Sequence, residues 1–293
     1  MQVISDLEAL RPARAALAGP VGLVPTMGAL HAGHLSLVEA ARADCHSVVV
    51  TIFINPLQFE AGSDFDKYPR DLPADLALLE SAGVDLVFTP TPDIMYPPGF
   101  QTTVRVAEVS KGLEGARRPG HFDGVATVLT KLFHLTQPDL AYFGQKDAQQ
   151  VVVVRRMVRD LNFPLEIVVC PTTREADGLA MSSRNRYLSP EERQHAASIY
   201  QALQAAAALY EDGERDADAL RGQVADLLSH VPGGELEYVS LADPGTLVEC
   251  AGPVSGPALL SLVLRLGETR LLDNLLLPVC LNTREGLTAT LGA

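Results

Sequence analysis

Buried strands and amphipathic helices alternate along the first part of the chain. Short continuous runs of apolar and β-branched residues predict strands that are covered on both faces. We expect these strands at Val21–Val24, Ser47–Ile54, Asp85–Phe88, Asp139–Phe143 and Leu165–Cys170. Apolar residues at helical spacing predict intervening helices, which we expect from Gly33 or His34 onward and at Pro73–Ser81, Val125–Leu135 and Ala148–Leu161. This alternation predicts an α/β domain.

The pattern changes after a polar segment near residues 171–178, where we expect a domain boundary that divides the chain into residues 1–174 and 175–293. A helix start at Ser189, followed by Pro190, predicts two helices that run through about His230. Strands are then expected at Glu235–Leu241 and Ala258–Leu264, and Arg270–Asn274 follows a turn at Gly267. This mixture predicts a smaller α+β domain. Four prolines between Thr89 and Phe100 argue against regular structure in that segment.

Composition narrows the class of protein. The formal net charge of −13 opposes general binding of nucleic acid, since a polyanion would be repelled. No apolar run approaches the roughly 20 residues of a membrane span, and Met1–Leu10 lacks the features of a signal peptide. We therefore expect a cytoplasmic protein with no membrane partner. The four cysteines have no paired spacing, which argues against a zinc site or a disulfide framework.

The segment Val21–Glu39 is the strongest candidate for a functional site. It reads as a strand that stops at Pro25, a glycine-containing turn and the start of a helix. The first turn of a helix offers free N–H groups and a positive dipole end to phosphate. His31 and His34 lie in that turn, where imidazoles can bind phosphate oxygens and stabilise charge at an attacked α-phosphate. The alternative is that both are loop histidines without chemistry.

Polar side chains follow three further elements. Asn55 and Gln58 come after the second strand, at the edge where parallel sheets bind ligands. Lys146 follows the strand that ends at Phe143, and a lysine there can neutralise phosphate oxygens as a point charge. Ser182, Ser183 and Arg184 supply hydroxyls and a guanidinium fork near the domain boundary. Alternatively, Gln58 could be an ordinary loop amide, residues 182–184 a surface turn, and Asp147 simply a helix cap.

Six motifs occur in a fixed order along the chain: PTMGALHAGH, IFINPLQF, RPGHFDG, FGQKDAQQ, GLAMSSRN and RLLDN. The first resembles the HxGH nucleotidyl-transferring superfamily, and the whole series is similar to the pantothenate synthetase family. The resemblance implies a Rossmann-like parallel-sheet domain with a C-terminal α+β lid, and a homodimer. It also implies that ATP, with Mg²⁺, activates pantoate as an adenylate that β-alanine then attacks, with release of pyrophosphate and AMP.

The resemblance also assigns residues. His34 and His31 are the expected catalytic residues, and Gln58 and Gln150 are expected to bind pantoate or β-alanine. The expected ATP-binding residues are Met27, Gly28, Ala29, Leu30, His31, Ala32, Gly33, His34, Gly144, Gln145, Lys146, Asp147, Thr173, Met181, Ser182, Ser183 and Arg184. Arg118 of the RPGHF loop is a further candidate contact, although surface arginines are usually just solvated.

The metal has no assigned protein ligand, and Asp75 is one candidate. Two positions depart from the family pattern, because glutamate is also familiar at Gln145 and an apolar residue is expected at Thr173. Two alternative functions keep the HxGH motif: an adenylyltransferase with a nucleotide or phosphate acceptor, and a non-catalytic nucleotide-binding regulator. Neither needs Gln58 and Gln150 for a small hydroxy acid.

Overall fold

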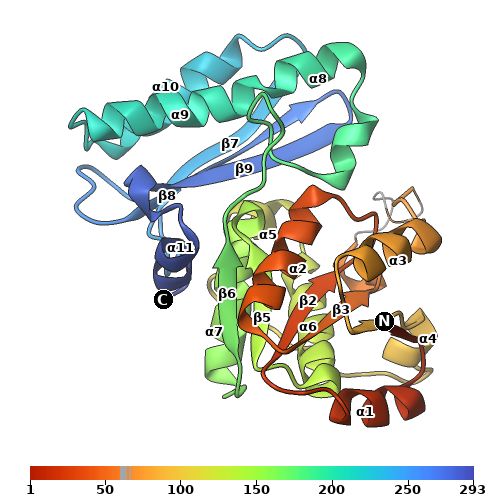
Figure 1. Cartoon of the computed structure of the whole chain (residues 1–293). Coiled ribbons are helices and arrows are strands. Elements are labelled where there is room, and N and C mark those ends of the chain that lie inside the picture. Colours follow the sequence, from red (N-terminus) through yellow and green to blue (C-terminus); the bar gives the residue numbers. More distant parts are fainter. Residues whose placement is uncertain (60–64, 66) are drawn as a thin grey trace. The chain divides into compact units, whose positions relative to one another are not determined.

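The computed structural model describes residues 1–59, 65 and 67–293 (Figure 1). It divides into two compact units. The first comprises Met1–Phe143 and Val153–Cys170, and the second comprises Gly144–Val152 and Pro171–Ala293. No helix among the described residues is long and apolar enough to cross a membrane.

The first unit is built on a six-stranded sheet in the order β1-β4-β3-β2-β5-β6. Its strands are β1 (Gln2–Ile4), β2 (Val21–Thr26), β3 (Ser47–Ile52), β4 (Leu86–Phe88), β5 (Leu140–Gly144) and β6 (Glu166–Cys170). The pairings from β1 through β5 are parallel. Strand β2 pairs with β3 on one side and β5 on the other, so the strand order reverses at β2, where open α/β sheets bind ligands. The predicted Rossmann-like architecture is confirmed.

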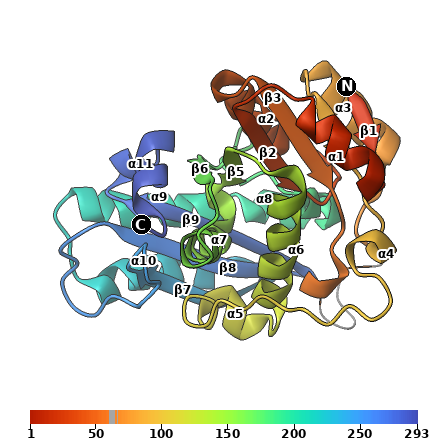
Figure 2. The ribbon, with the colours of Figure 1, turned by 90° about the horizontal axis from the view of Figure 1, so that it is seen from below.

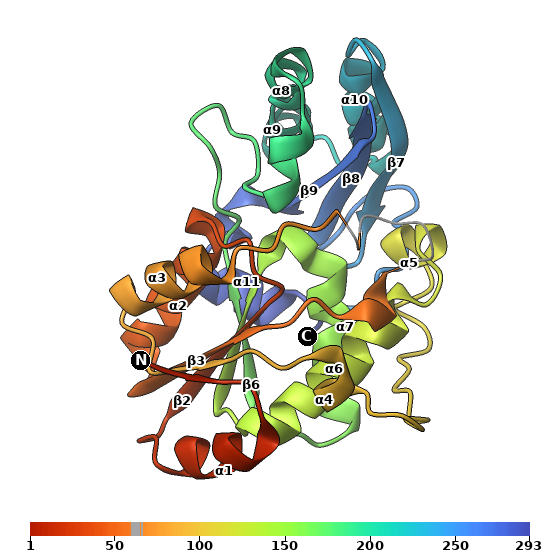
Figure 3. The same ribbon diagram turned by 90° about the vertical axis from the view of Figure 1, so that its right-hand side faces the viewer.

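Helices cover both faces of this sheet. The helices of this unit are α1 (Leu7–Ala15), α2 (Ala32–Asp44), α3 (Leu72–Ser81), α4 (Pro92–Met95), α5 (Leu113–Arg117), α6 (His121–Thr136) and α7 (Ala148–Asp160), with the 3₁₀ turn η1 (Pro56–Gln58). The 3₁₀ turn η2 (Gln145–Asp147) and the first residues of α7 belong to the second unit. One core cluster joins Val38 of α2 and Leu79 of α3 to Val24, Val48 and Val87 of the strands. Figure 3 shows α2 and α3 on one side of the strands and α6 on the other.

The second unit has an antiparallel sheet of β7 (Gly234–Ala242), β8 (Ala258–Leu266) and β9 (Thr269–Leu277), in that order. Its helices are η3 (Ser183–Tyr187), α8 (Pro190–Ala196), α9 (Ser198–Glu211), α10 (Ala217–Ser229), η4 (Val279–Leu281) and α11 (Arg284–Thr290). The strands run past α9 in Figure 2. Leu203 of α9, Leu220 of α10 and Leu262 of β8 are fully buried in one core, so the helices cover one face of the sheet.

Three expectations about elements were wrong. Strand β2 does not stop before Pro25, which pairs in register with Thr51. The carbonyl of Thr26 accepts from Phe53 on the β3 side, so the donor that Pro25 lacks would point toward β5, where pairing ends at Leu23.

The other two corrections concern helices. The proline-rich segment contains the short helix α4, which begins at Pro92, because proline is well suited to the first turn. The region from Ser189 to His230 contains three helices instead of two. Ser198 donates its hydroxyl to the carbonyl of His195 where α8 gives way to α9, a local bond that competes with continuous helix.

Candidate active site

A tight turn after β2 is held by one buried carboxylate. Gly28 and Ala29 both have left-handed backbone angles, with φ of 80° and 52°. Such a conformation is strained for alanine. Asp75 of α3, which is 4% exposed, accepts from the N–H of Ala29 at 2.9 Å and of Leu30 at 2.8 Å. A side chain on Gly28 would come within 2.9 Å of the same carboxylate. Asp75 therefore fixes the backbone that leads to the histidines.

The two histidines form the N-terminal cap of α2. His31 accepts through Nδ1 from the N–H of Gly33 at 3.1 Å, and His34 accepts through Nδ1 from the N–H of His31 at 3.4 Å. Their rings lie 4.1 Å apart. Because Nδ1 accepts in both rings, the proton of each neutral ring is on Nε2, which makes Nε2 a hydrogen-bond donor. The helix start and both donors are the elements that an anion would use.

Gln58, in the turn η1, is oriented by a buried asparagine. Asn55 is 1% exposed and donates to Oε1 of Gln58 at 3.0 Å and to the carbonyl of Gly124 at 3.1 Å. Its own Oδ1 accepts from the hydroxyl of Tyr96 at 2.7 Å. Gln58 donates through Nε2 to the sulfur of Met27 at 2.9 Å. The amide of Gln58 keeps one further donor and one further acceptor position by its chemistry.

The RPGHF loop supports the backbone of Gln58. Nδ1 of His121 lies 2.9 Å from the carbonyl oxygen of Gln58 and donates to it, since a carbonyl only accepts. Arg118 donates to Nε2 of His121 at 3.3 Å and to the same carbonyl at 3.4 Å. Arg118 is therefore not a simple solvated arginine. Its contacts give it a supporting position beside the predicted pantoate residue.

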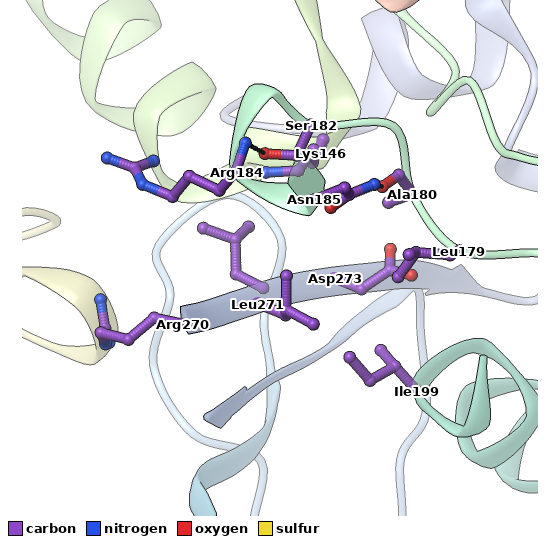
Figure 4. Close-up of a pocket in the computed structure, with 11 residues that line it drawn as sticks. Lys146, Leu179, Ala180, Ser182, Arg184, Asn185, Ile199, Arg270, Leu271 and Asp273 are labelled. Atoms are coloured by element: carbon purple, nitrogen blue, oxygen red, sulfur yellow. Dashed lines mark hydrogen bonds between the residues drawn. The ribbon is translucent and has the colours of Figure 1, made fainter. Parts of the chain in front are cut away.

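In the second unit, a pocket joins residues that are far apart in sequence (Figure 4). Lys146, which follows β5, lines it together with Ser182 and Arg184. The other lining residues are Leu179, Ala180, Asn185, Ile199, Arg270, Leu271, Leu272 and Asp273. Arg270 donates to both carboxylate oxygens of Glu237 at 2.8 Å, so its charge is already balanced. The ammonium of Lys146 and the guanidinium of Arg184, beside the hydroxyl of Ser182, match the charge of a polyphosphate.

The turn that carries Lys146 is held by strand β9. Asn274, which is 1% exposed, donates to the carbonyl of Gln145 at 3.1 Å and of Lys146 at 2.9 Å. The buried amide of Gln145 donates to Asn282 at 2.6 Å. Asp147 is exposed, and its Oδ1 lies 3.9 Å from Nζ of Lys146. Gln150 lies half-buried on α7.

The segment from Thr173 to Arg184 forms a hairpin and then a 3₁₀ turn. The carbonyl of Thr173 accepts from the N–H of Met181 at 2.9 Å. Ser182 caps the following turn, since its hydroxyl oxygen accepts from the N–H of Arg184 at 3.2 Å. Local capping explains this contact of Ser182, while its hydroxyl proton can still be donated to a ligand.

The structure therefore gathers the predicted residues into two sets, one in each unit. Met27, His31, His34 and Gln58 belong to the first unit, and Lys146 with the segment from Met181 to Arg184 belongs to the second. Sequence reasoning did not single out Asn185, Arg270 or Asp273, although the RLLDN motif contains two of them. Within the described residues, no group of three or more His, Cys, Asp or Glu side chains could hold a metal ion.

Known proteins match this chain along nearly its whole length. The family model described as pantoate-beta-alanine ligase matches residues 2–276. The chain belongs to this family. The family comprises ligases that condense pantoate with β-alanine at the expense of ATP, so the chain is an ATP-dependent ligase. The predicted family and reaction class are confirmed.

Individual relatives agree with the family. A pantothenate synthetase of Roseiflexus sp. (strain RS-1) is 56% identical over 94% of this chain and 99% of its own. The crystal structure of pantothenate synthetase from Thermus thermophilus matches with a TM-score of 0.89 at 50% identity, covering 94% of this chain and 99% of that one. A pantoate-beta-alanine ligase from Francisella tularensis, complexed with beta-gamma ATP and β-alanine, matches with a TM-score of 0.77 at 33% identity over 94% and 97%.

Proposed function

We propose that this member of the pantoate–β-alanine ligase family works in two steps through pantoyl adenylate. The carboxylate of (R)-pantoate attacks the α-phosphate of ATP and pyrophosphate leaves. The amine of β-alanine then attacks the acyl carbon and AMP leaves. The main support is the pocket in which Lys146, Ser182 and Arg184 meet, because a ligase that releases pyrophosphate needs cations for that leaving group.

The proposal gives each set of residues a role. His31 and His34 contact the phosphates, and His34 stabilises the charge that grows at the α-phosphate, since Nε2 of its ring is a donor at a helix start. Lys146, Ser182, Ser183 and Arg184 hold the β- and γ-phosphates. The two amides of Gln58 and Gln150 bind pantoate. Displacement at phosphorus needs positioning and charge stabilisation but no nucleophilic side chain.

Magnesium enters with ATP in this proposal. Both oxygens of Asp75 already accept backbone N–H groups, so this carboxylate does not suit a metal. Mg²⁺ is usually held by substrate phosphates and water with few protein ligands, and exposed Asp147 could supply one at most. The ion would neutralise the phosphates during the attack. The lid role of the C-terminal part, the homodimer and the cytoplasmic location stay predictions.

The reaction is tested by product analysis with ATP, Mg²⁺, pantoate and β-alanine, omitting each in turn. We expect AMP and pantothenate only from the complete mixture, and exchange of labelled pyrophosphate into ATP that needs pantoate and Mg²⁺ but not β-alanine. Exchange that requires β-alanine would overturn the two-step scheme. AMP transfer to a nucleotide or phosphate acceptor would instead support another adenylyltransferase.

Replacing Gln58 with alanine is expected to raise the KM for pantoate about 10-fold. A buried hydroxyl or carboxylate of the substrate would lose its partner, at a cost of about 1 to 3 kcal/mol. The KM for ATP should barely change. Steady-state kinetics on Gln58→Ala and on the exposed control Gln101→Ala would measure this. An equal rise in the KM for pantoate and the KM for ATP would indicate that Gln58 is a structural residue.

Replacing Arg184 with alanine is expected to weaken pyrophosphate exchange roughly 10- to 100-fold, because one charge-assisted contact to the leaving group is lost. Attack of β-alanine on preformed adenylate should stay nearly unchanged. Arg186 is a matched control, since it lies exposed on the same 3₁₀ turn. A defect of Arg184→Ala that is confined to the amine step would remove Arg184 from the phosphate site.

A further inference from the structure

The segment that carries Ser182 and Arg184 is held by a buried ion pair whose members lie 99 residues apart in sequence. Arg174 donates to the two carboxylate oxygens of Asp273 at 2.5 Å and 3.0 Å through separate nitrogens. The side chains are only 15% and 1% exposed, respectively. A planar guanidinium that binds a carboxylate at two points fixes orientation as well as distance, which an ammonium does not.

Backbone pairing connects Arg174 to the segment that contains Ser182 and Arg184. Arg174 forms an antiparallel bridge with Ala180, and the N–H of Glu175 donates to the carbonyl of Leu179 at 2.8 Å. Ala180 is two residues before Ser182. The ion pair of Arg174 with Asp273 of β9 therefore determines where the second strand of the hairpin runs and where the turn at Ser182 begins.

The tip of the hairpin rests on an aromatic ring. The guanidinium carbon of Arg174 lies 3.7 Å from the ring centre of Tyr200 in α9, and the same guanidinium donates to the carbonyl of Gly178 at 3.0 Å. Gly178 has a φ of 94°, and a β-carbon there would come within 2.4 Å of the Tyr200 ring. Only glycine permits this close approach.

A second arginine fixes the outer side of the hairpin. Arg193 of α8 donates to Glu175 at 2.6 Å and to Asp177 at 2.5 Å, and its hydrogen bond lowers the pKa of Asp177. Asn185 donates to Glu175 at 2.7 Å and to the carbonyl of Ala180 at 3.1 Å. These contacts tie the turn that follows Ser182 back to the residue next to Arg174.

We propose that Arg174 and Asp273 are positioning residues that hold Ser182 and Arg184 in the geometry needed to bind the pyrophosphate portion of ATP. Asp273 lines the same pocket as Ser182 and Arg184 (Figure 4), so one member of the ion pair is part of the pocket wall. This inference rests on the proposed function of that pocket. Neither residue needs to touch the nucleotide.

The test compares two conservative variants that lose similar contacts. Arg174→Lys keeps the charge but loses the fork and its stacking on Tyr200. Arg215→Lys is the control, because Arg215 stacks on Tyr210 at 4.0 Å and donates to the carbonyl of Glu214 at 2.7 Å, yet does not line the pocket. Pantoate-dependent pyrophosphate exchange and thermal unfolding are measured for both.

We expect Arg174→Lys to raise the KM for pyrophosphate about 10-fold or more, because even a small displacement of a binding group can strongly reduce binding and rate. The rate of amine attack on preformed adenylate should stay within about 2-fold, as should all rates of Arg215→Lys. Equal exchange in the two variants would overturn the inference while leaving the proposed function intact. Absence of exchange in the unaltered protein would overturn both.

Gly178→Ala gives the same test without changing a charged group. Its β-carbon would push the hairpin away from Tyr200, so the same rise in the KM for pyrophosphate is expected. Gly178→Ala also tests the positioning role if Arg174→Lys yields too little folded protein. Normal pyrophosphate exchange in folded Gly178→Ala would contradict the positioning role.

Discussion

Replacing His34 with alanine is expected to lower the rate of adenylate formation by about 100-fold or more, in line with the loss of one preorganised electrostatic donor. ATP binding should weaken much less, because the helix start and His31 remain. The ring of His34 accepts from the backbone through Nδ1, which leaves Nε2 as its donor. Single-turnover adenylation and ATP affinity, measured separately, would separate the two effects.

A second substitution distinguishes chemistry from capping. Asparagine at position 34 can still accept the N–H of His31 but lacks the distant ring donor, so His34→Asn should be as slow as His34→Ala and nearly as stable as the unaltered protein. His46→Ala is the control, since that exposed ring contacts only the carbonyl of Gly19 in the described part of the chain. Near-normal adenylation by either His34 variant would contradict the assignment.

Replacing Asp75 with alanine is expected to lower the free energy of unfolding by about 3 kcal/mol or more. Two hydrogen bonds to a charged group are lost, each of about 1.5 to 3 kcal/mol, and the N–H groups of Ala29 and Leu30 are left buried. Because the turn before His31 depends on this carboxylate, adenylation should also fall. Urea denaturation followed by single-turnover kinetics would measure both.

The same helix offers a matched control. Asp71 caps α3 through the N–H of Ala74 at 3.2 Å and is exposed, so Asp71→Ala should cost only about 1 kcal/mol. If Asp75 were instead a ligand of magnesium, higher Mg²⁺ concentrations would restore the activity of Asp75→Asn. We expect no such restoration.

Much of the fold follows from local patterns. Apolar runs predicted the main strands because a strand covered on both faces has no polar side, and the glycine turn after β2 marked the start of α2. The course of β2 through Pro25 could not be predicted in this way. It depends on which side of the strand is unpaired, and that is decided by where the pairing of β2 with β5 ends, at Leu23 and Ala141, which are more than 100 residues apart.

In the candidate site, too, local motifs predict some residues, whereas others are evident only from long-range contacts. His31, His34 and Gln58 lie in short motifs whose chemistry is evident in the sequence. Residues that hold the site lie far away in sequence. Asp75, which holds the turn before His31, is 46 residues from Ala29, and Asp273, which holds the hairpin before Ser182, is 99 residues from Arg174. A carboxylate that accepts distant backbone N–H groups has no local pattern, so the sequence alone could not predict that Asp75 holds the turn of Ala29 and Leu30.

The dependence of the Lys146 turn on Asn274 has a consequence for synthesis of the chain on the ribosome. Asn274 donates to the carbonyl of Lys146 from 128 residues further along the chain. The HxGH turn and its carboxylate partner Asp75 are complete within 46 residues and can form early. The lysine turn must wait until β9 has emerged. A nascent chain therefore completes the turn of His31 and His34 long before the turn of Lys146 is fixed, and a ribosome stalled before residue 274 would carry a protein in which Lys146 is not yet held.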